Sequence, residues 1–350
     1  MTNNPYILDI LSQPQVLRTA LEGFDPAPLE HLSAAIQRGD FDRIVLTGMG
    51  GSLYASYPAW LALANAGLPA MWVDTAELIH HVPGLITPRT LLWLFSQSGK
   101  SAEIVSALDF ERLRRPEALL ATVNDLDSPL AKATEKFDGP SARVSINAIV
   151  EKTVSTRTYT NTLAVGQLAA LALLHGDVRS ALSTLKQTAN AMSDYLVHWE
   201  DRVAGLAKQI GFPRRLAILG RGASMSAVYT GSLILGEAAK YSATPFQAAE
   251  FRHGPLELVN PDLTVLLFAG PTETRDLNLR LFKDLRGYDA KAFWIGSGVD
   301  EWQIDLPEVP AVGMPLMEIL PMQLLSIHFA RQIGVEPGHF FRTGKITLAE

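Results

Sequence analysis

The chain has 350 residues, a formal net charge of −6 at pH 7 and no cysteine. This length is enough for about two domains with a core each, and an acidic balance without a basic block argues against a nucleic-acid-binding surface. The absence of cysteine excludes disulfides and thiolate chemistry, and the lack of a membrane-length apolar run or a signal-peptide pattern predicts a cytoplasmic protein with no membrane partner.

In the first half, predicted strands alternate with predicted helices. A helix is expected at about residues 14–21, with Ser12 and Pro14 as its cap and first-turn residues. Helix-length segments then separate apolar runs, which is typical of a parallel, doubly wound sheet. The five runs are residues 44–46, 70–73, 90–95, 119–123 and 144–146.

The second half repeats this order after a helical linker at about residues 179–210. Its apolar runs are residues 216–219, 263–268 and 292–295, with a weaker run at 309–312. From residue 336 onward no helical period is visible, so an irregular tail is expected. The predicted organisation is an N-terminal helical segment (1–30), a first domain (31–175), a linker (176–210), a second domain (211–335) and a tail (336–350).

A segment of the second domain repeats one of the first. Residues 43–63 align without a gap on residues 215–235, and both copies read as a strand, a Gly-x-Gly-x-Ser turn ending at Ser52 or Ser224, and a helix. This local plan holds an anion at a helix N-terminus. The first hypothesis is therefore that both turns bind a phosphate group, or that one turn binds it and the other has lost this function. The alternative is that unrelated strand–turn–helix units share their turn glycines.

The same glycines do not make a dinucleotide fingerprint. That fingerprint needs a third glycine where the helix approaches the strand, and Leu53 and Met225 occupy this position in the two copies. Asp74 would be an acceptable ribose ligand, but the glycine pattern fails in both copies. A nicotinamide cofactor is therefore not expected.

The turn after residues 90–95 holds the densest group of hydroxyls. Ser96, Ser98 and Ser101 stand within six residues, immediately before a predicted helix. Neutral hydroxyls, turn amides and a helix dipole together bind a phosphate group. Serine and glycine also fill turns and cap helices, so ordinary capping is the alternative. Residues 154–160 add further hydroxyls before an apolar helix, with the same alternative open.

Two acid–base candidates follow the second copy of the repeat. Glu237 lies in an otherwise apolar helix, where partial burial would raise the pKa of its carboxyl group toward the range of a general base. His253 precedes Gly254 and Pro255, which fix a turn and so orient the imidazole. Taken alone, a surface or ion-paired glutamate and a structural turn histidine remain the ordinary alternatives.

Together these residues resemble the double sugar-isomerase (SIS) domain family, most closely the isomerase half of glucosamine-6-phosphate synthase. The segments that carry the resemblance are residues 96–101, 220–222 and 250–256 together with Glu237, and the similarity extends from residue 10 to residue 345. It implies an α/β fold of two tandem SIS domains, each a five-stranded parallel doubly wound sheet flanked by helices. It also implies catalysis without a metal or cofactor.

The resemblance implies a role for each candidate residue. Glu237 would move a proton between sugar carbons 1 and 2, and His253 would open the sugar ring, reaching in from the other subunit of a homodimer with a shared active site. Lys345, in the tail, would close over the substrate. The sugar phosphate would be held by hydroxyls and one amide, on Ser52, Ser96, Gln97, Ser98 and Ser101.

The sequence departs from the synthase in three places. The chain lacks a glutaminase domain and its cysteine nucleophile, so glutamine-dependent synthesis is not expected. Ile234 stands one helical turn before Glu237, where the synthase carries a lysine able to form an imine, and whether Lys240 compensates is open. The segment from Glu151 to Arg157 is one residue shorter than the family spacing, so the resemblance assigns these two residues no clear role.

The expected activity is the conversion of glucosamine 6-phosphate and water into fructose 6-phosphate and ammonia. One alternative is another aminosugar or ketose phosphate isomerase, and another is a deglycase of fructose-amino-acid 6-phosphates. A different class of protein, a non-catalytic sugar-phosphate sensor, would need an output module. The first 30 residues hold no helix-turn-helix pair with a basic recognition helix, which disfavours the sensor.

Overall fold

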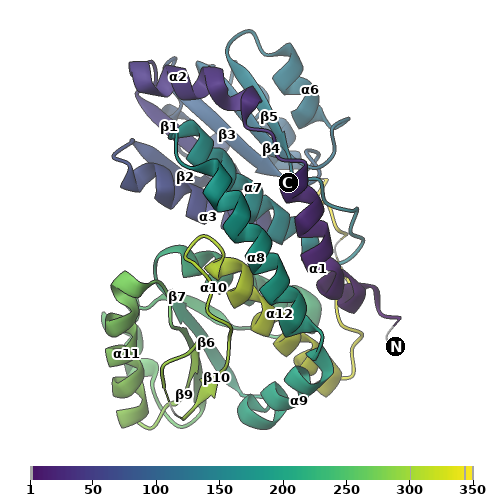
Figure 1. Ribbon diagram of the computed structural model, residues 1–350, viewed down its shortest axis with the longest axis vertical. Coiled ribbons are helices and arrows are strands. Elements are labelled where there is room, and N and C mark those ends of the chain that lie inside the picture. Colours follow the sequence, from purple (N-terminus) through teal and green to yellow (C-terminus); the bar gives the residue numbers. More distant parts are fainter. Residues whose placement is uncertain (1–2, 300, 343, 349–350) are drawn as a thin grey trace. The chain divides into compact units, whose positions relative to one another are not determined.

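The computed structural model describes residues 3–299, 301–342 and 344–348. Contacts divide the chain into two compact units, neither of which is one continuous stretch of sequence. Unit 1 comprises Met1–Pro14, Lys152–Val154 and Gln187–Phe341, and unit 2 comprises Gln15–Glu151, Ser155–Lys186 and Arg342–Glu350. Each unit contains one parallel sheet flanked by helices (Figure 1).

The sheet of unit 2 has five parallel strands in the order β2-β1-β3-β4-β5. Its central strand β3 is buried along its whole length, as expected for a strand covered on both faces. The strands are β1 (Arg43–Gly48), β2 (Ala70–Asp74), β3 (Thr90–Ser96), β4 (Ala118–Val123) and β5 (Ser141–Ser145).

Alternate residues of β3 enter two different cores of unit 2. Trp93 and Phe95 pack with the helices on one face, and Leu92 and Leu94 pack with those on the other, which is the period-two alternation of a strand. The first face is covered by α2 (Glu30–Arg38), α3 (Gly50–Asn65) and α7 (Arg157–Leu173), together with η1 (Ala27–Leu29). The second is covered by α4 (Thr75–His80), α5 (Ala102–Ser106) and α6 (Pro129–Lys136), beside η2 (Pro83–Leu85).

The sheet of unit 1 has the order β10-β9-β8-β6-β7, with every pair parallel. Counted from the other edge, this is the strand order of unit 2. The strands are β6 (Arg215–Gly220), β7 (Thr244–Gln247), β8 (Leu263–Phe268), β9 (Lys291–Ile295) and β10 (Gln303–Ile304). The two repeat copies therefore form equivalent elements, since β1 and β6 begin at the aligned residues Arg43 and Arg215.

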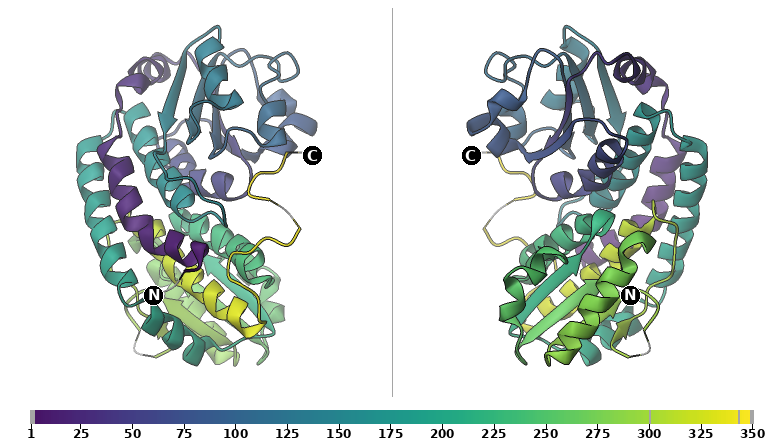
Figure 2. Two further views of the ribbon diagram at one scale, coloured as in Figure 1. Left: turned by 90° about the vertical axis from the view of Figure 1, so that its right-hand side faces the viewer. Right: turned by 90° about the vertical axis from the view of Figure 1, so that its left-hand side faces the viewer.

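Helices pack on this second sheet in the same way, and α11 can be followed along one side of it (Figure 2). The helical elements of unit 1 are α9 (Trp199–Ile210), η3 (Gly222–Ser224), α10 (Met225–Ala239), η4 (Glu250–Arg252), η5 (Pro255–Leu258), α11 (Thr272–Gly287) and α12 (Met314–Gln332). Two long helices, α1 (Pro5–Glu22) and α8 (Val178–Leu196), contribute residues to both units. No helix in the described ranges combines the length and apolar character of a membrane span.

The α/β class and the two five-stranded sheets confirm the predicted fold, but three local predictions are wrong. Helix α1 begins at Pro5, so Pro14 lies inside it and Ser12 donates to the carbonyl of Asp9 instead of capping a helix. Residues 309–312 form no strand. Strands β7 and β10, which do complete the second sheet, were missed because they are only four and two residues long.

Candidate functional site

The serine-rich turn joins β3 to α5 in unit 2. Ser96 is the last residue of β3, and Ser101 occupies the N-cap position of α5 without a side-chain cap bond. Between them, Gly99 has φ = +61°, and a Cβ atom there would lie 2.3 Å from the Ser128 hydroxyl oxygen. Only glycine allows this conformation and this close approach, so the tight turn depends on Gly99.

Two hydroxyls of the turn are buried and accept backbone hydrogen bonds. The Ser96 hydroxyl accepts from the amide of Gly99 at 3.0 Å, and the Ser98 hydroxyl accepts from the amide of Lys100 at 3.2 Å. A hydroxyl that accepts in this way keeps its own proton for donation. These backbone bonds fix the positions of both hydroxyl oxygens at this edge of the sheet.

The rest of the turn is anchored to the loop after β4. The carbonyl of Gln97 accepts from the amides of Asn124 at 3.1 Å and Asp125 at 3.4 Å. Lys100 forms an ion pair with Asp125, and this hydrogen bond is the main reason that the pKa of Asp125 is lowered. The Lys100 charge is therefore committed to a neighbouring carboxylate, and the side chain of Gln97 remains half-buried.

Ser52 comes from the first repeat copy and lies at the same edge of the sheet. It is the third residue of α3, which follows β1, and β1 pairs with β3 so that Gly48 is opposite Phe95. A Cβ atom on Gly48 would lie 2.8 Å from the Phe95 carbonyl oxygen. The structure thus brings the ends of β1 and β3, with Ser52 and the serine turn, to one edge, which is where open α/β sheets bind ligands.

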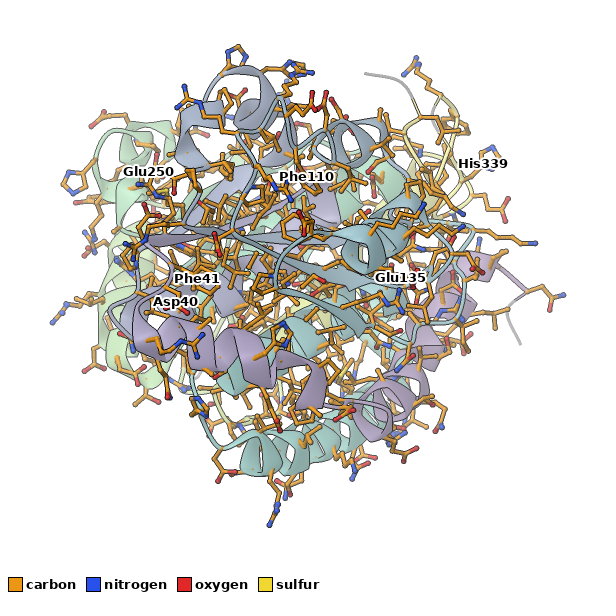
Figure 3. All side chains as sticks on the ribbon, turned by 90° about the horizontal axis from the view of Figure 1, so that it is seen from above. Asp40, Phe41, Phe110, Glu135, Glu250 and His339 are labelled. Carbon is orange, nitrogen blue, oxygen red and sulfur yellow. The ribbon has the colours of Figure 1, made fainter. Side chains whose placement is uncertain are left out.

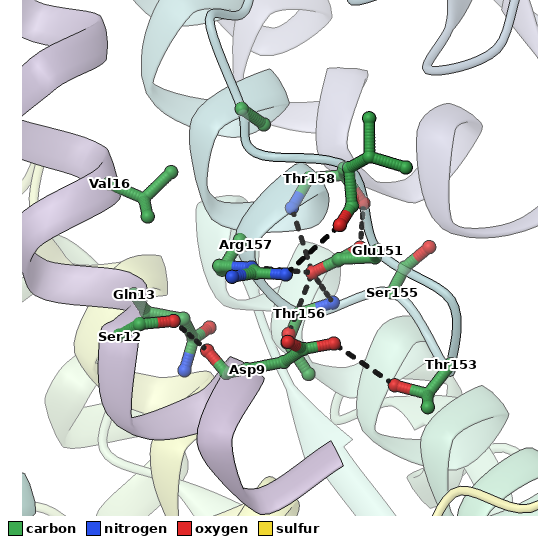
Figure 4. A network of polar contacts seen from close by, with 12 residues as sticks. Asp9, Ser12, Gln13, Val16, Glu151, Thr153, Ser155, Thr156, Arg157 and Thr158 are labelled. Atoms are coloured by element: carbon green, nitrogen blue, oxygen red, sulfur yellow. Dashed lines mark hydrogen bonds and ion pairs between the residues drawn. The ribbon is translucent and has the colours of Figure 1, made fainter. Parts of the chain in front are cut away.

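Glu151 is the residue that sequence reasoning left without a role. Its side chain is fully buried, and its carboxylate accepts hydrogen bonds from both the amide and the hydroxyl of Thr156, at 3.0 and 2.7 Å (Figure 4). The amide and hydroxyl of Thr158 donate to it as well, at 3.2 and 2.5 Å. The N-cap and first turn of α7 therefore form a cradle of hydroxyl and amide donors for this carboxylate.

Lys345 supplies the counter-charge. Its ammonium nitrogen lies 3.1 Å from a carboxylate oxygen of Glu151 and 2.9 Å from the hydroxyl of Ser155. Burial alone would raise the pKa of Glu151, but the Lys345 charge and the bonds from Thr158 and Thr156 outweigh burial and lower it. Glu151 is therefore ionised, and two sequence signals marked this segment: the hydroxyls of residues 154–160 and the shortened spacing before Arg157.

The tail also contacts the helix that follows the serine turn. The carbonyl of Thr347 accepts from the amide of Ala102 at 3.1 Å, and Ala102 is the first residue of α5. The first amides of a helix have no partner within the helix. Residues 345–347 thus connect the Glu151 cradle to the start of α5, all within unit 2.

Glu237 lies in the last turn of α10 in unit 1 and is half-buried. Lys240, which caps this helix, donates to the backbone carbonyl of Glu237 and to the carbonyl of His339 at 2.6 Å, and the side chain of His339 is exposed (Figure 3). Burial lowers the pKa of Lys240, with Glu237 partly opposing the change. The Lys240 amine is therefore held by backbone carbonyls, while Ile234 is buried.

His253 is exposed in the turn after η4. Its amide donates to the carbonyl of Glu250 at 2.8 Å, and the Glu250 side chain is exposed as well (Figure 3). Gly254 follows with φ = +124°, a conformation that favours glycine. Of the candidate residues, Glu237 and His253 belong to unit 1, whereas the serines, Gln97 and Lys345 belong to unit 2.

Asp74, which the sequence suggested as an acceptable ribose ligand, lies at the N-cap of α4. The carboxylate of Asp74 accepts from the amides of Ala76 and Glu77 and so caps α4, which is a structural use. In the described ranges, no group of three or more His, Cys, Asp or Glu side chains is arranged to hold a metal ion.

Comparison with known proteins places these observations in a family. The SIS domain model matches residues 40–172 and 212–330. Glutamine–fructose-6-phosphate aminotransferase (isomerizing) of Pyrococcus horikoshii is 26% identical over 336 residues, covering 94% of this chain and 55% of that protein. The chain thus spans about half the length of the curated relatives it matches.

Solved structures agree on the fold. The C-terminal domain of glucosamine-fructose-6-phosphate aminotransferase from Francisella tularensis superposes with a TM-score of 0.82 at 19% identity, covering 95% of this chain and 97% of that one. Glucosamine-6-phosphate deaminase from Thermotoga maritima superposes with a TM-score of 0.73 at 16% identity, covering 95% and 96%. With the two matched segments and the two sheets of identical strand order, the chain belongs to the SIS domain family.

Proposed function

We propose that the chain binds a phosphosugar and interconverts its aldose and ketose forms. The observation that carries this proposal is the turn from Ser96 to Ser101, where two buried hydroxyls are positioned by backbone amides just before a helix and would donate their own protons to a phosphate. Ser52, Gln97 and Ser101 stand at the same edge and would complete the phosphate site. Membership in the SIS family and the sugar-phosphate names of the relatives support this choice of ligand.

The specific reaction we propose is the deamination of glucosamine 6-phosphate. His253 would open the ring, and Glu237 would then move a proton from carbon 2 to carbon 1, giving an imine at carbon 2. Water would add to this imine and ammonia would leave, which yields fructose 6-phosphate. A positioned carboxylate suffices for the proton shift, because the iminium and carbonyl groups of the sugar make the transferred proton acidic.

Two features favour deamination over synthesis with a bound ketose imine. Ile234 cannot form an imine with a ketose. Lys240, the nearest alternative amine in sequence, is held by the carbonyls of Glu237 and His339. Lys345 is the remaining amine among the candidates. We propose that its ammonium group leaves Glu151 and contacts the substrate when the tail closes over the site.

The test is ammonia release from glucosamine 6-phosphate by the purified protein, with fructose 6-phosphate measured in parallel. We expect the two products in equal amounts, and a loss of turnover of roughly 100-fold or more in Glu237→Gln with phosphosugar binding retained. Glu257→Gln, which removes an exposed carboxylate in the same unit, is the matched control and should leave turnover unchanged.

The same assay separates the alternatives. Three further kinds of substrate are supplied in turn: galactosamine 6-phosphate, aldose and ketose phosphates without a nitrogen donor, and fructose-amino-acid phosphates. Turnover of one of these without ammonia from glucosamine 6-phosphate would overturn deamination and leave the isomerase proposal standing. Phosphosugar binding without turnover of any of them, unaffected by Glu237→Gln, would identify a sensor.

A further inference from the structure

Unit 1 contains a pocket that the proposed reaction does not use. The pocket has a volume of about 150 Å³ and lies beyond the ends of β8 and β9, at the start of α11 and beside α12. It lies at the carboxyl edge of the second sheet, the edge along which open α/β folds bind ligands. The polar side chains that line it are Thr272, Arg275, Ser297, Glu308 and Glu318.

Glu318 gives this pocket an unpartnered buried polar group. The residue is only 2% exposed. One of its carboxyl oxygens accepts from the hydroxyl of Ser224 at 2.9 Å, and the other oxygen has no hydrogen-bond partner among the described residues. Buried polar groups are nearly always paired, so an exception at a pocket wall calls for an explanation.

The protonation state of Glu318 makes the unpartnered oxygen a donor. Burial raises the pKa of Glu318 to about 8, and the bond from Ser224 opposes this only in part. The carboxyl group is therefore neutral at pH 7. Because the Ser224 hydroxyl already donates to one oxygen, the proton belongs on the other, where the O–H group has no acceptor among the described residues.

Arg275 brings positive charge to the same pocket. Its guanidinium donates to the carbonyl and hydroxyl oxygens of Ser297 at 2.6 and 2.8 Å, which fixes its position. Its partner carboxylate, Glu308, is 3.4 Å away and 69% exposed. An ion pair with so exposed a partner contributes little stability, so an entering anion could replace Glu308.

The start of α11 adds to this positive potential. Its N-cap residue, Pro271, makes no side-chain cap bond, and Thr272 at the first helical position lines the pocket. The first amides of a 16-residue helix favour a negative group. Arg275, these amides and the O–H of Glu318 thus supply donors. Besides Glu318, the acidic side chain that lines the pocket is Glu308, while Glu273 stands in the first turn of α11 outside the lining.

We propose that unit 1 holds a second small-molecule site, specific for a compact anion that also carries a neutral hydroxyl or carbonyl oxygen. Arg275 and the start of α11 bind the anionic group, and Glu318 donates a hydrogen bond to the neutral oxygen. Short phosphate esters and hydroxycarboxylates share this chemistry. The second Gly-x-Gly-x-Ser turn acts here indirectly, since Ser224 positions Glu318 and Gly222 lies beside Pro271.

The site has a built-in reporter in Trp294. Its indole N–H donates to the carbonyl of Ser297 at 2.7 Å, and Ser297 also holds Arg275. The protein is labelled with 5-fluorotryptophan, and the Trp294 signal is assigned with Trp294→Phe. A Ser96→Ala/Ser98→Ala background weakens the proposed phosphate site of unit 2, so that binding there is not mistaken for binding to unit 1.

Glycerol 3-phosphate and glycerate are titrated separately to about 10 mM, the range of a millimolar site. We expect at least one of them to shift the Trp294 signal saturably, whereas glycerol should not. Comparison of the two titrations shows whether the site prefers a phosphate ester or a carboxylate. No shift with either anion would overturn the proposal, whatever the outcome of the ammonia assay.

Four variants test the assigned contacts. Arg275→Met and Glu318→Leu should each weaken binding about tenfold or more, because each removes one donor. Glu318→Gln keeps a neutral donor and should bind within about threefold of the parent. Glu308→Gln removes the carboxylate that competes for Arg275, so this variant should bind the anion at least as tightly as the parent. Equal binding by the parent and Arg275→Met would overturn the assignment.

Discussion

The pKa values of two buried glutamates shift in opposite directions, because Glu151 faces the Lys345 charge and several donors whereas Glu318 faces a single hydroxyl. Glu151 receives hydrogen bonds from Thr156, Thr158 and Lys345, and its pKa is lowered despite complete burial. Glu318 receives one bond, from Ser224, and its pKa rises to about 8. Burial is common to both, so the local donors decide whether the carboxyl group is charged.

Replacement of Glu151 should cost much of the stability of the protein. Glu151→Ala leaves the donors of Thr156 and Thr158 and the charge of Lys345 without their acceptor, for which we expect a loss of about 3–5 kcal/mol in the free energy of unfolding. Lys345→Met keeps the threonine bonds and should cost less. Urea unfolding of both variants measures this, and equal losses would contradict the cradle described here.

The charge of Glu151 also sets the direction of a pH effect. Its folded-state pKa lies below the unfolded value of 4.5, so its contribution is present above pH 4.5 and is lost as the pH falls through the folded-state value. Glu151→Gln should therefore be less stable than the parent at neutral pH, with a smaller further loss in acid. Unfolding free energies between pH 3 and 7 would reveal the difference.

For Glu318 we expect stability to change with pH in the opposite direction. Its folded-state pKa of about 8 lies above the unfolded value of 4.5, so the stability that comes from its bound proton is fully present below pH 4.5 and declines as the pH rises toward 8. The slope for one group is about 1.4 kcal/mol per pH unit. Glu318→Gln should remove this slope in unfolding measurements, and an unchanged slope would show that Glu318 is already ionised.

At the scale of elements, the serine turn depends on one glycine more than on its serines. Gly99→Ala imposes a left-handed φ on alanine and brings its Cβ against Ser128, whereas Gly39→Ala imposes a similar φ with no atom within 4 Å. We expect about 1 kcal/mol of destabilisation at Gly39 and clearly more at Gly99. Urea unfolding of the pair, with phosphosugar affinity measured beside it, separates backbone strain from the collision.

The anchoring of the tail on α5 gives a second prediction at this scale. Lys345→Met removes the ion pair with Glu151, which should release the Thr347 carbonyl from the amide of Ala102. Hydrogen exchange of a peptide containing Ala102 should then become faster. Lys136→Met, at an exposed position in α6, serves as the control and should leave this exchange unchanged.

Long buried strands were predictable from the sequence and short edge strands were not. Strand β3 can be recognised in the sequence as a continuous apolar run, because both of its faces are covered. Strand β7 has exposed or half-buried residues throughout, and one of them is Pro245, so its composition resembles that of a loop. Its place in the sheet comes from pairing with β6, which no local pattern encodes.

For the whole molecule, the repeat predicted two domains, and the rule that ligands bind at the carboxyl ends of parallel strands directed attention to the serine turn. The repeat could not predict that the two equivalent serines differ, because Ser224 donates to Glu318, which is far away in sequence. Nor could it pair Lys345 with Glu151 across 194 positions of the chain. Long-range polar pairs depend on the packed structure, and a single sequence carries no periodic signal for them.

The proposed homodimer predicts complementation between inactive variants. If His253 acts in the site of the other subunit, a mixed dimer of His253→Ala and Glu237→Gln contains one site in which both residues are intact. Such a dimer should recover up to about half the activity of the parent dimer, because one of its two independent sites is intact. Verified mixed dimers without any recovery would contradict the shared site.

The interleaved assignment of the chain to its two units restricts how the protein can be divided. Unit 2 takes its last residues from the C-terminus, after the whole second sheet. A fragment ending near Lys186 would hold a complete first sheet and yet lack Lys345, whose ammonium nitrogen lies 3.1 Å from the buried Glu151 carboxylate. Despite the visible duplication, the two halves of the chain are therefore not interchangeable, because the first sheet's unit depends on a lysine that the C-terminal segment supplies.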